Sequence, residues 1–101
     1  MAIRYGPQVE AELDDIWFYI AKESGSIDIA ERLVASITEH FFLLSRHPQL
    51  GRRRDDLRAG LRSLSVGGYV VIYRIDGPDV LIFHVLHGRR DIKALVSETQ
   101  K

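Results

Sequence analysis

The sequence predicts an α+β domain in which an N-terminal antiparallel helical hairpin packs on one face of a small, mainly antiparallel β-sheet. Apolar residues recur at helical spacing over residues 9–21 and again over 29–44. Residues 61–87 are instead dense in β-branched and aromatic side chains, and glycine-containing turns divide them. The 101 residues, 46% hydrophobic and 28% charged, give room for one core, so we expect a single domain over residues 1–101.

The N-terminal half is expected to form a short edge strand followed by the two helices. Ile3-Arg4-Tyr5 gives the strand, and Gly6-Pro7 ends it. The apolar face of the first helix comprises Val9, Leu13, Ile16, Trp17, Ile20 and Ala21. Asp28 is the expected N-cap of the second helix, which Pro48 ends. Its apolar face comprises Ile29, Leu33, Val34, Ile37, Phe41 and Leu44.

The C-terminal half is expected to supply the sheet. Residues 52–58 form a charged connector, and strands are predicted over 61–66, 69–75 and 80–87. Gly67-Gly68 is a strong hairpin signal, and residues 76–79 give the next turn. Residues 92–98 are predicted to form a short terminal helix. The sheet face away from the hairpin is expected to be open to solvent or to a partner.

The charges cancel in total but not along the chain. Fourteen basic residues balance fourteen acidic ones, yet residues 1–45 hold three basic and eight acidic side chains. Residues 46–101 hold eleven basic and six acidic, and arginine dominates. Arginine offers planar, bidentate donors to phosphates and carboxylates. The zero net charge disfavours a general DNA-binding protein, because non-specific affinity for DNA comes from contacts between positive side chains and phosphates.

Several function classes lack their sequence signals. The chain has no cysteine, which excludes disulfides, Cys-based zinc sites and cysteine nucleophiles. No dinucleotide or P-loop fingerprint occurs, so we expect no cofactor. His84 and His87 are three apart on a predicted strand and point to opposite faces, which disfavours a shared metal ion. Without a leader or an apolar span, the chain is expected to be cytoplasmic, with no membrane partner.

The candidate functional residues are mostly arginines. Eight arginines fall within the 39 residues 52–90. In an antiparallel meander the strand ends can converge, so we expect a basic rim near the open face. The rim would comprise all eight: Arg52, Arg53, Arg54, Arg58, Arg62, Arg74, Arg89 and Arg90. His87 on that face is a candidate proton donor. The alternative is a solvated loop whose arginines pair with Asp55, Asp56 and Asp91 at little energetic gain.

Aromatic residues allow two interpretations as well. Trp17 lies at helical spacing with Leu13 and Ile20, which is typical of core packing. The alternative is an anchor covered by a partner protein, since tryptophan is enriched at binding hot spots. Tyr69 and Tyr73 share one strand face and are interpreted as packing residues.

In combination, five sequence blocks carry a family resemblance over nearly the whole chain. They are residues 11–19 (AELDDIWFY), 47–52 (HPQLGR), 57–62 (LRAGLR), 69–74 (YVVIYR) and 85–91 (VLHGRRD). The chain resembles the ParE/RelE toxin superfamily of bacterial toxin–antitoxin systems, and more closely its ParE branch of plasmid stabilisation toxins. The resemblance implies two helices packed on a small antiparallel sheet.

The superfamily resemblance implies one of two activities. RelE-like members cut mRNA on the ribosome with a basic set and often a terminal tyrosine. Here Leu61, Ser63, Val70 and Val96 stand near those positions, and Arg90 alone matches clearly. ParE-like members poison DNA gyrase without a catalytic centre. The ParE activity is therefore favoured. The alternatives are a ribosome-dependent endoribonuclease using His87, Arg90 and Arg62, and a degenerate toxin that only binds its antitoxin.

The resemblance also implies partners and surfaces. A ParD-like antitoxin would wrap the toxin in a hetero-oligomer, and an amphipathic partner helix needs an apolar channel. Leu13, Trp17 and Ile20 are the candidate antitoxin contacts. The target-binding candidates, facing gyrase or alternatively the ribosome and its mRNA, are Arg62, Arg74, His87, Arg89 and Arg90.

Overall fold

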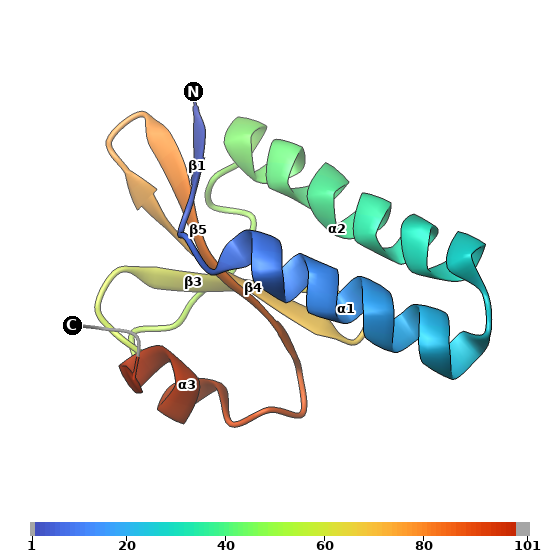
Figure 1. Ribbon diagram of the computed structural model, residues 1–101. Helices are drawn as coiled ribbons and strands as arrows, with labels where there is room; N and C mark the ends of the chain where they lie inside the picture. Colours follow the sequence, from blue (N-terminus) through green and yellow to red (C-terminus); the bar gives the residue numbers. More distant parts are fainter. Residues whose placement is uncertain (1, 99–101) are drawn as a thin grey trace.

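A five-stranded mixed sheet in the order β1-β5-β4-β3-β2 is the centre of the fold. The computed structural model describes residues 2–98 (Figure 1). Its elements are β1 (Ile3–Tyr5), α1 (Val9–Ser24), α2 (Ile27–Arg46), β2 (Arg52–Arg53), β3 (Leu61–Val66), β4 (Tyr69–Asp76), β5 (Asp79–His87) and α3 (Ile92–Glu98). The predicted α+β class is confirmed. Among residues 2–98, no helix is both long and apolar enough to cross a membrane.

The strand pairing explains why the sheet is mixed. β1 runs parallel to β5. The other neighbouring pairs, β5 with β4, β4 with β3 and β3 with β2, are antiparallel. The two-residue strand β2 was not predicted. It lies in the charged connector and pairs Arg52 with Ser63. Two consecutive arginines carry no alternating apolar pattern, so pairing with β3 is what makes this segment a strand.

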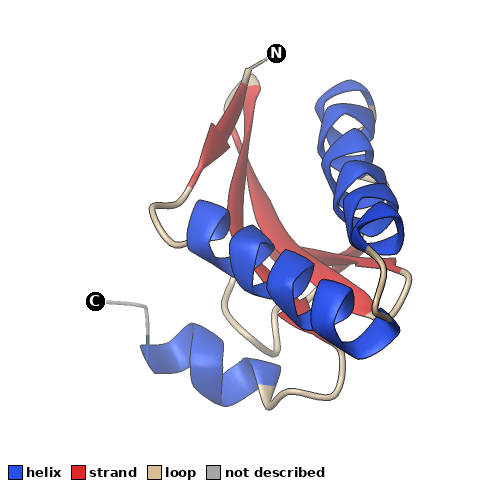
Figure 2. Cartoon of the chain, turned by 45° about the vertical axis from the view of Figure 1, so that its right-hand side comes forward, coloured by secondary structure: helices blue, strands red, loops and turns tan. Residues whose placement is uncertain are grey.

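Helices α1 and α2 form the predicted hairpin across one face of the sheet (Figure 2). Gly25 follows α1 in the left-handed region, at φ 68°, which glycine adopts at little cost. The N-cap of α2 is Ser26, whose Oγ accepts a 3.2 Å hydrogen bond from the Ile29 N–H. The prediction of Asp28 as N-cap was therefore wrong. Asp28 lies in the first helical turn, where its negative charge interacts favourably with the helix dipole.

The main core lies between the hairpin and the sheet. Ile37, Phe41 and Leu44 of α2 are buried against Val71 and Tyr73 of β4. The predicted apolar face of α2 is confirmed except at Ile29, which is exposed. Tyr69 and Tyr73 belong to this core, as predicted.

The opposite face of the sheet is not open along its whole length, contrary to the prediction. Leu57, Leu61, Ile72 and Val96 form a second buried cluster there. Val96 comes from α3, which lies apart from the hairpin (Figure 1). A short C-terminal helix with one well-placed apolar side chain therefore covers part of the face.

The edge of β5 is completed by side chains of the α1 region. β1 pairs with β5 only as far as Ile82. Beyond it, Gln8 Nε2 donates to the Phe83 carbonyl. Glu12 accepts a 2.9 Å bond from the Val85 N–H and a 2.6 Å bond from His84 Nδ1. These groups take the place of the missing strand partner and fix the second half of β5, which leads to the candidate site.

Candidate functional site

The candidate site is built around the loop that follows β5. Gly88 N–H donates to the Gly68 carbonyl at 2.9 Å, which ties the loop to the β3–β4 turn. Arg90 N–H donates to the His87 carbonyl, and Arg89 N–H donates to His87 Nδ1, both at 3.0 Å. Because the loop backbone is held by these bonds, the exposed side chains of Arg89 and Arg90 project from an ordered turn.

An aromatic hollow of about 500 Å³ lies on the α1 side of this loop. We define it by Ile16, Tyr19, Tyr69, His87, Arg89 and Arg90, and Glu12 and Asp15 also line it. The rings of Tyr69 and His87 meet edge to face with centroids 5.2 Å apart. Burial raises the pKa of Tyr69. His87 therefore lies on the helix side of the sheet, and its prediction on the open face was wrong.

A basic cleft of about 420 Å³ lies on the opposite side of the same loop. We define it by Arg52, Arg54, Ser63, Ser65, Arg90 and Lys93, and Val70 and Asp91 also line it. Arg90 lines both hollows. The cleft lies at the polar end of the sheet face opposite the helical hairpin, next to the apolar cluster around Ile72. Strand pairing explains the juxtaposition, since Arg52 lies opposite Ser63.

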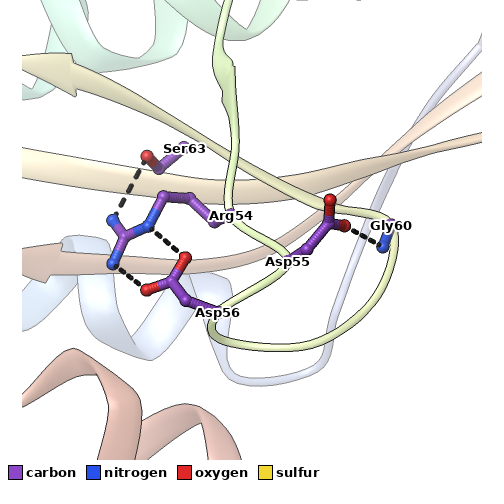
Figure 3. A network of polar contacts seen from close by, with 5 residues as sticks. All are labelled: Arg54, Asp55, Asp56, Gly60 and Ser63. Atoms are coloured by element: carbon purple, nitrogen blue, oxygen red, sulfur yellow. Dashed lines mark hydrogen bonds and ion pairs between the residues drawn. The ribbon is translucent and has the colours of Figure 1, made fainter.

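A polar network holds the wall of the basic cleft in place (Figure 3). Arg54 donates to both oxygens of Asp56, at 3.0 and 3.1 Å, and to Ser63 Oγ at 3.5 Å. This hydrogen bonding by Arg54 lowers the pKa of Asp56. Asp55 Oδ1 accepts from the Gly60 N–H at 3.1 Å, and that bond, with Arg53 nearby, lowers the pKa of Asp55. The carboxylates thus close the connector loop on itself.

The predicted basic rim divides into two groups. His87 lies opposite Tyr69 at one end of the β4–β5 ladder, whereas Arg74 lies opposite Leu81 near the other. Arg74 places its guanidinium over the Phe83 ring, 5.4 Å from the centroid. Arg62 donates to the Gly51 carbonyl at 2.8 Å. The expected convergence of Arg62 and Arg74 with Arg89 and Arg90 was therefore wrong, because adjacent turns of a meander lie at opposite ends of its strands.

The candidate antitoxin contacts lie at the margin of the core. Leu13 and Ile20 are half-buried and pack against the main core. Trp17, also half-buried, meets Phe18 edge to face with ring centroids 5.2 Å apart. Phe18 is 67% exposed. The sequence pattern missed this exposed ring, which lies outside the periodic apolar stripe.

Two further groups were missed by sequence reasoning. Glu12 was counted among the acidic residues of the helix start, and no sequence signal shows that it binds the edge of β5. Lys93 joins the basic cleft because α3 starts beside it. Within residues 2–98, no group of three or more histidine, aspartate or glutamate side chains is placed to hold a metal ion.

Comparison with known proteins decides the family. Residues 3–92 match the model of the ParE toxin of type II toxin–antitoxin systems, parDE. The chain belongs to the ParE toxin family. Toxin ParE3 of Caulobacter vibrioides is 38% identical over 86 residues, which are 85% of each chain. The resemblance inferred from the five sequence blocks is thereby confirmed.

Solved structures agree with the fold of this ParE-family toxin. A chain of the chromosomal ParDE toxin–antitoxin system from P. aeruginosa superposes with a TM-score of 0.75 at 21% identity. The match covers 86% of this chain and 95% of that one. A chain of the RelBE2 toxin–antitoxin complex from Mycobacterium tuberculosis gives a TM-score of 0.63 at 28% identity. It covers 85% of this chain and 95% of that one.

Proposed function

We propose that this ParE-family toxin poisons DNA gyrase as a binding protein, with no catalytic centre of its own. The observation that carries the proposal is the chemistry at the positions where RelE-like nucleases hold their catalytic side chains. Leu61 and Val96 stand near two of these positions and lie in the second buried apolar cluster. Ser63 and Val70 line the basic cleft with Arg90, the one clear match. Proton transfer and charge stabilisation at an RNA phosphate need more polar groups than this set supplies.

The proposed target-binding surface is the end of β5 and its loop. His87, Arg89 and Arg90 lie together there, on the walls of the aromatic hollow. Arg62 and Arg74 lie outside this surface, so we do not expect their removal to weaken target binding as strongly. A basic, partly aromatic surface is suited to hold a larger assembly, because arginine and aromatic anchors dominate binding energies.

We also propose that a ParD-like antitoxin neutralises the toxin by covering α1. The solved relatives belong to the ParDE system and to the RelBE2 toxin–antitoxin complex, which supports such a partner. The proposed contacts are Trp17 and the exposed parts of Leu13 and Ile20, with Phe18 beside them. An amphipathic helix of the antitoxin would bury these rings in an apolar contact.

The test is a gyrase supercoiling assay with the purified toxin, with and without its antitoxin. We expect inhibition that the antitoxin relieves, and an Arg89→Ala/Arg90→Ala variant that inhibits at least tenfold less. Arg4→Ala/Arg32→Ala, with the same change in charge on distant elements, is the control. If active toxin in large excess leaves gyrase unaffected, gyrase is not the target.

The same preparation separates the alternatives. Cleavage of mRNA on ribosomes, abolished by His87→Ala or Arg90→Ala, would support the endoribonuclease instead. Growth arrest on expression without the antitoxin excludes a degenerate toxin. Loss of antitoxin binding in Trp17→Ala, with Tyr19→Phe as the control, tests the antitoxin surface. Unchanged antitoxin affinity in Trp17→Ala would place that surface elsewhere.

A further inference from the structure

The basic cleft holds more positive than negative side chains, and three of its cations form no ion pair in the part of the chain that the structure describes. Arg54 is paired with Asp56. Asp91, the acidic residue of the lining, accepts a 3.2 Å bond from the Ala94 N–H and so caps α3. Across residues 2–98, the three remaining cations of the cleft form no ion pair; they are Arg52, Arg90 and Lys93.

Three like charges in one concavity favour an anionic ligand. The cations outnumber the carboxylate of Asp91, and a cleft with an excess of one sign of charge concentrates counter-ions of the other sign. Two of the three cations are arginines, which bind phosphate oxygens in a bidentate geometry. Ser65, which carries a hydroxyl, also lines the cleft and is exposed. The chemistry of the cleft therefore fits phosphate groups.

The arrangement fits a chain of phosphates better than a single small anion. Arg52 comes from β2, Arg90 from the loop after β5 and Lys93 from α3. Because Arg90 lines the aromatic hollow as well, a ligand seated in the cleft can continue past this side chain. An extended polyanion would contact all three segments at once.

The neighbouring hollow distinguishes nucleic acid from an acidic protein segment. Glu12 and Asp15 line it. The Glu12 carboxylate is bound to His84 and to the Val85 N–H, which leaves the exposed Asp15 as the acidic group beside a continuing ligand. Asp15 would repel an acidic side chain that continued from the cleft into the hollow. A DNA duplex instead alternates its phosphates with uncharged sugars, so a sugar can face the hollow and pack against a ring such as Tyr19 while the phosphates stay on the cations of the cleft.

We propose that the basic cleft binds the phosphate backbone of DNA, so that the toxin contacts the DNA held by gyrase as well as the enzyme. The choice of DNA over RNA rests on the proposed function. Neutralising three phosphates of a duplex gives a slope of about −2.7 in a plot of log affinity against log salt. A rise from about 50 to 200 mM salt then weakens binding about 40-fold.

Direct binding to a labelled DNA duplex, measured by fluorescence anisotropy without gyrase, tests the cleft. The test variant is Arg52→Gln/Arg90→Gln/Lys93→Gln. The control is Lys22→Gln/Arg32→Gln/Arg46→Gln, which removes the same charge from exposed positions on α1 and α2. Thermal unfolding of each variant verifies folding. We expect wild type and control to bind alike with the predicted slope, and the test variant to lose at least tenfold in affinity and most of the slope.

Three outcomes overturn the proposal. They are equal losses in the two triple variants, no binding of wild type even at about 20 mM salt, and preferential binding of an RNA of the same sequence or of poly-glutamate. Supercoiling assays with the same proteins separate this inference from the proposed function. If wild type and cleft variant inhibit gyrase equally, the DNA contact and the role of Arg90 in the target-binding surface are both refuted, and gyrase poisoning stands. If wild type binds DNA through the cleft but leaves gyrase active, the cleft assignment stands and gyrase poisoning is refuted.

Discussion

The hydroxyl of Tyr73 is predicted to hold the loop between α2 and β2 onto the core. The side chain is fully buried, and its Oη donates to the Pro48 carbonyl at 2.7 Å. The same oxygen accepts a 2.8 Å bond from the Gly51 N–H. Tyr73→Phe removes one oxygen atom and leaves both backbone groups without this partner. The loop leads directly to Arg52, so its position matters for the basic cleft.

The size of the effect follows from these two hydrogen bonds. Each contributes about 1 kcal/mol net, and a buried N–H left unpaired costs about 1–3 kcal/mol. We therefore expect Tyr73→Phe to lower the free energy of unfolding by about 2–3 kcal/mol. For a domain of this size the melting temperature would fall by about 8–24 °C. Urea unfolding and thermal unfolding, followed by circular dichroism, measure both values.

Tyr19→Phe is the matched control, because Tyr19 is 57% exposed and its change should stay within about 0.5 kcal/mol. A Tyr73→Phe effect below about 0.5 kcal/mol with an unchanged urea slope would refute the reasoning. It would mean that the loop does not depend on the buried hydroxyl.

High pH gives a second readout of the same residue. Burial raises the pKa of Tyr73 above its ordinary value of 10. The unfolded chain therefore releases this proton first, and unfolding becomes more favourable as the pH rises above about 10. Stability from this group is complete below that pH. Tyr73→Phe should lose less stability than wild type as the pH rises above about 10, and equal losses would contradict the assignment.

Three further perturbations test the supports of the site. Gly51→Ala should destabilise the fold by at least about 1–3 kcal/mol, because an added Cβ would lie 2.6 Å from Tyr73 Oη and 2.7 Å from the Ser63 carbonyl oxygen; unchanged urea unfolding would contradict this. Glu12→Ala should lower the free energy of unfolding by about 2–3 kcal/mol, because it removes the hydrogen bonds to His84 and Val85. Glu10→Ala, at an exposed position, is the control and should leave that free energy nearly unchanged. Equal effects of the two variants in urea unfolding would refute the reasoning. Because Asp55 and Asp56 have lowered pKa values, the stability that their ionised carboxylates give to the connector loop is complete above the ordinary pKa of 3.8 and is lost as the pH falls below it. Hydrogen exchange at Gly60 N–H should then accelerate relative to Gly68 N–H, and equal rates down to about pH 2 would contradict the network.

The sequence by itself determined the elements and the family. Helical spacing around Ile37 and Phe41 and the dense apolar segments around Val71 predicted α1, α2, β3, β4 and β5. Such periodicities are local, because each side chain's direction depends on its own few neighbours in the chain. The five sequence blocks, read together, also identified the superfamily, and the match over residues 3–92 confirmed its ParE branch.

The tertiary structure alone decided which charges share a surface. Arg62 and Arg74 were grouped with Arg89 and Arg90 from sequence, but the register places Arg74 near the far end of the β4–β5 ladder. Arg52, which was also part of the predicted rim, does join Arg90 in the basic cleft, together with Lys93, which was not predicted. Long-range pairing sets these positions: β2 against β3, the loop after β5 against Gly68, and α3 against the second cluster. No local pattern encodes such pairings, because their energy comes from contacts between segments tens of residues apart.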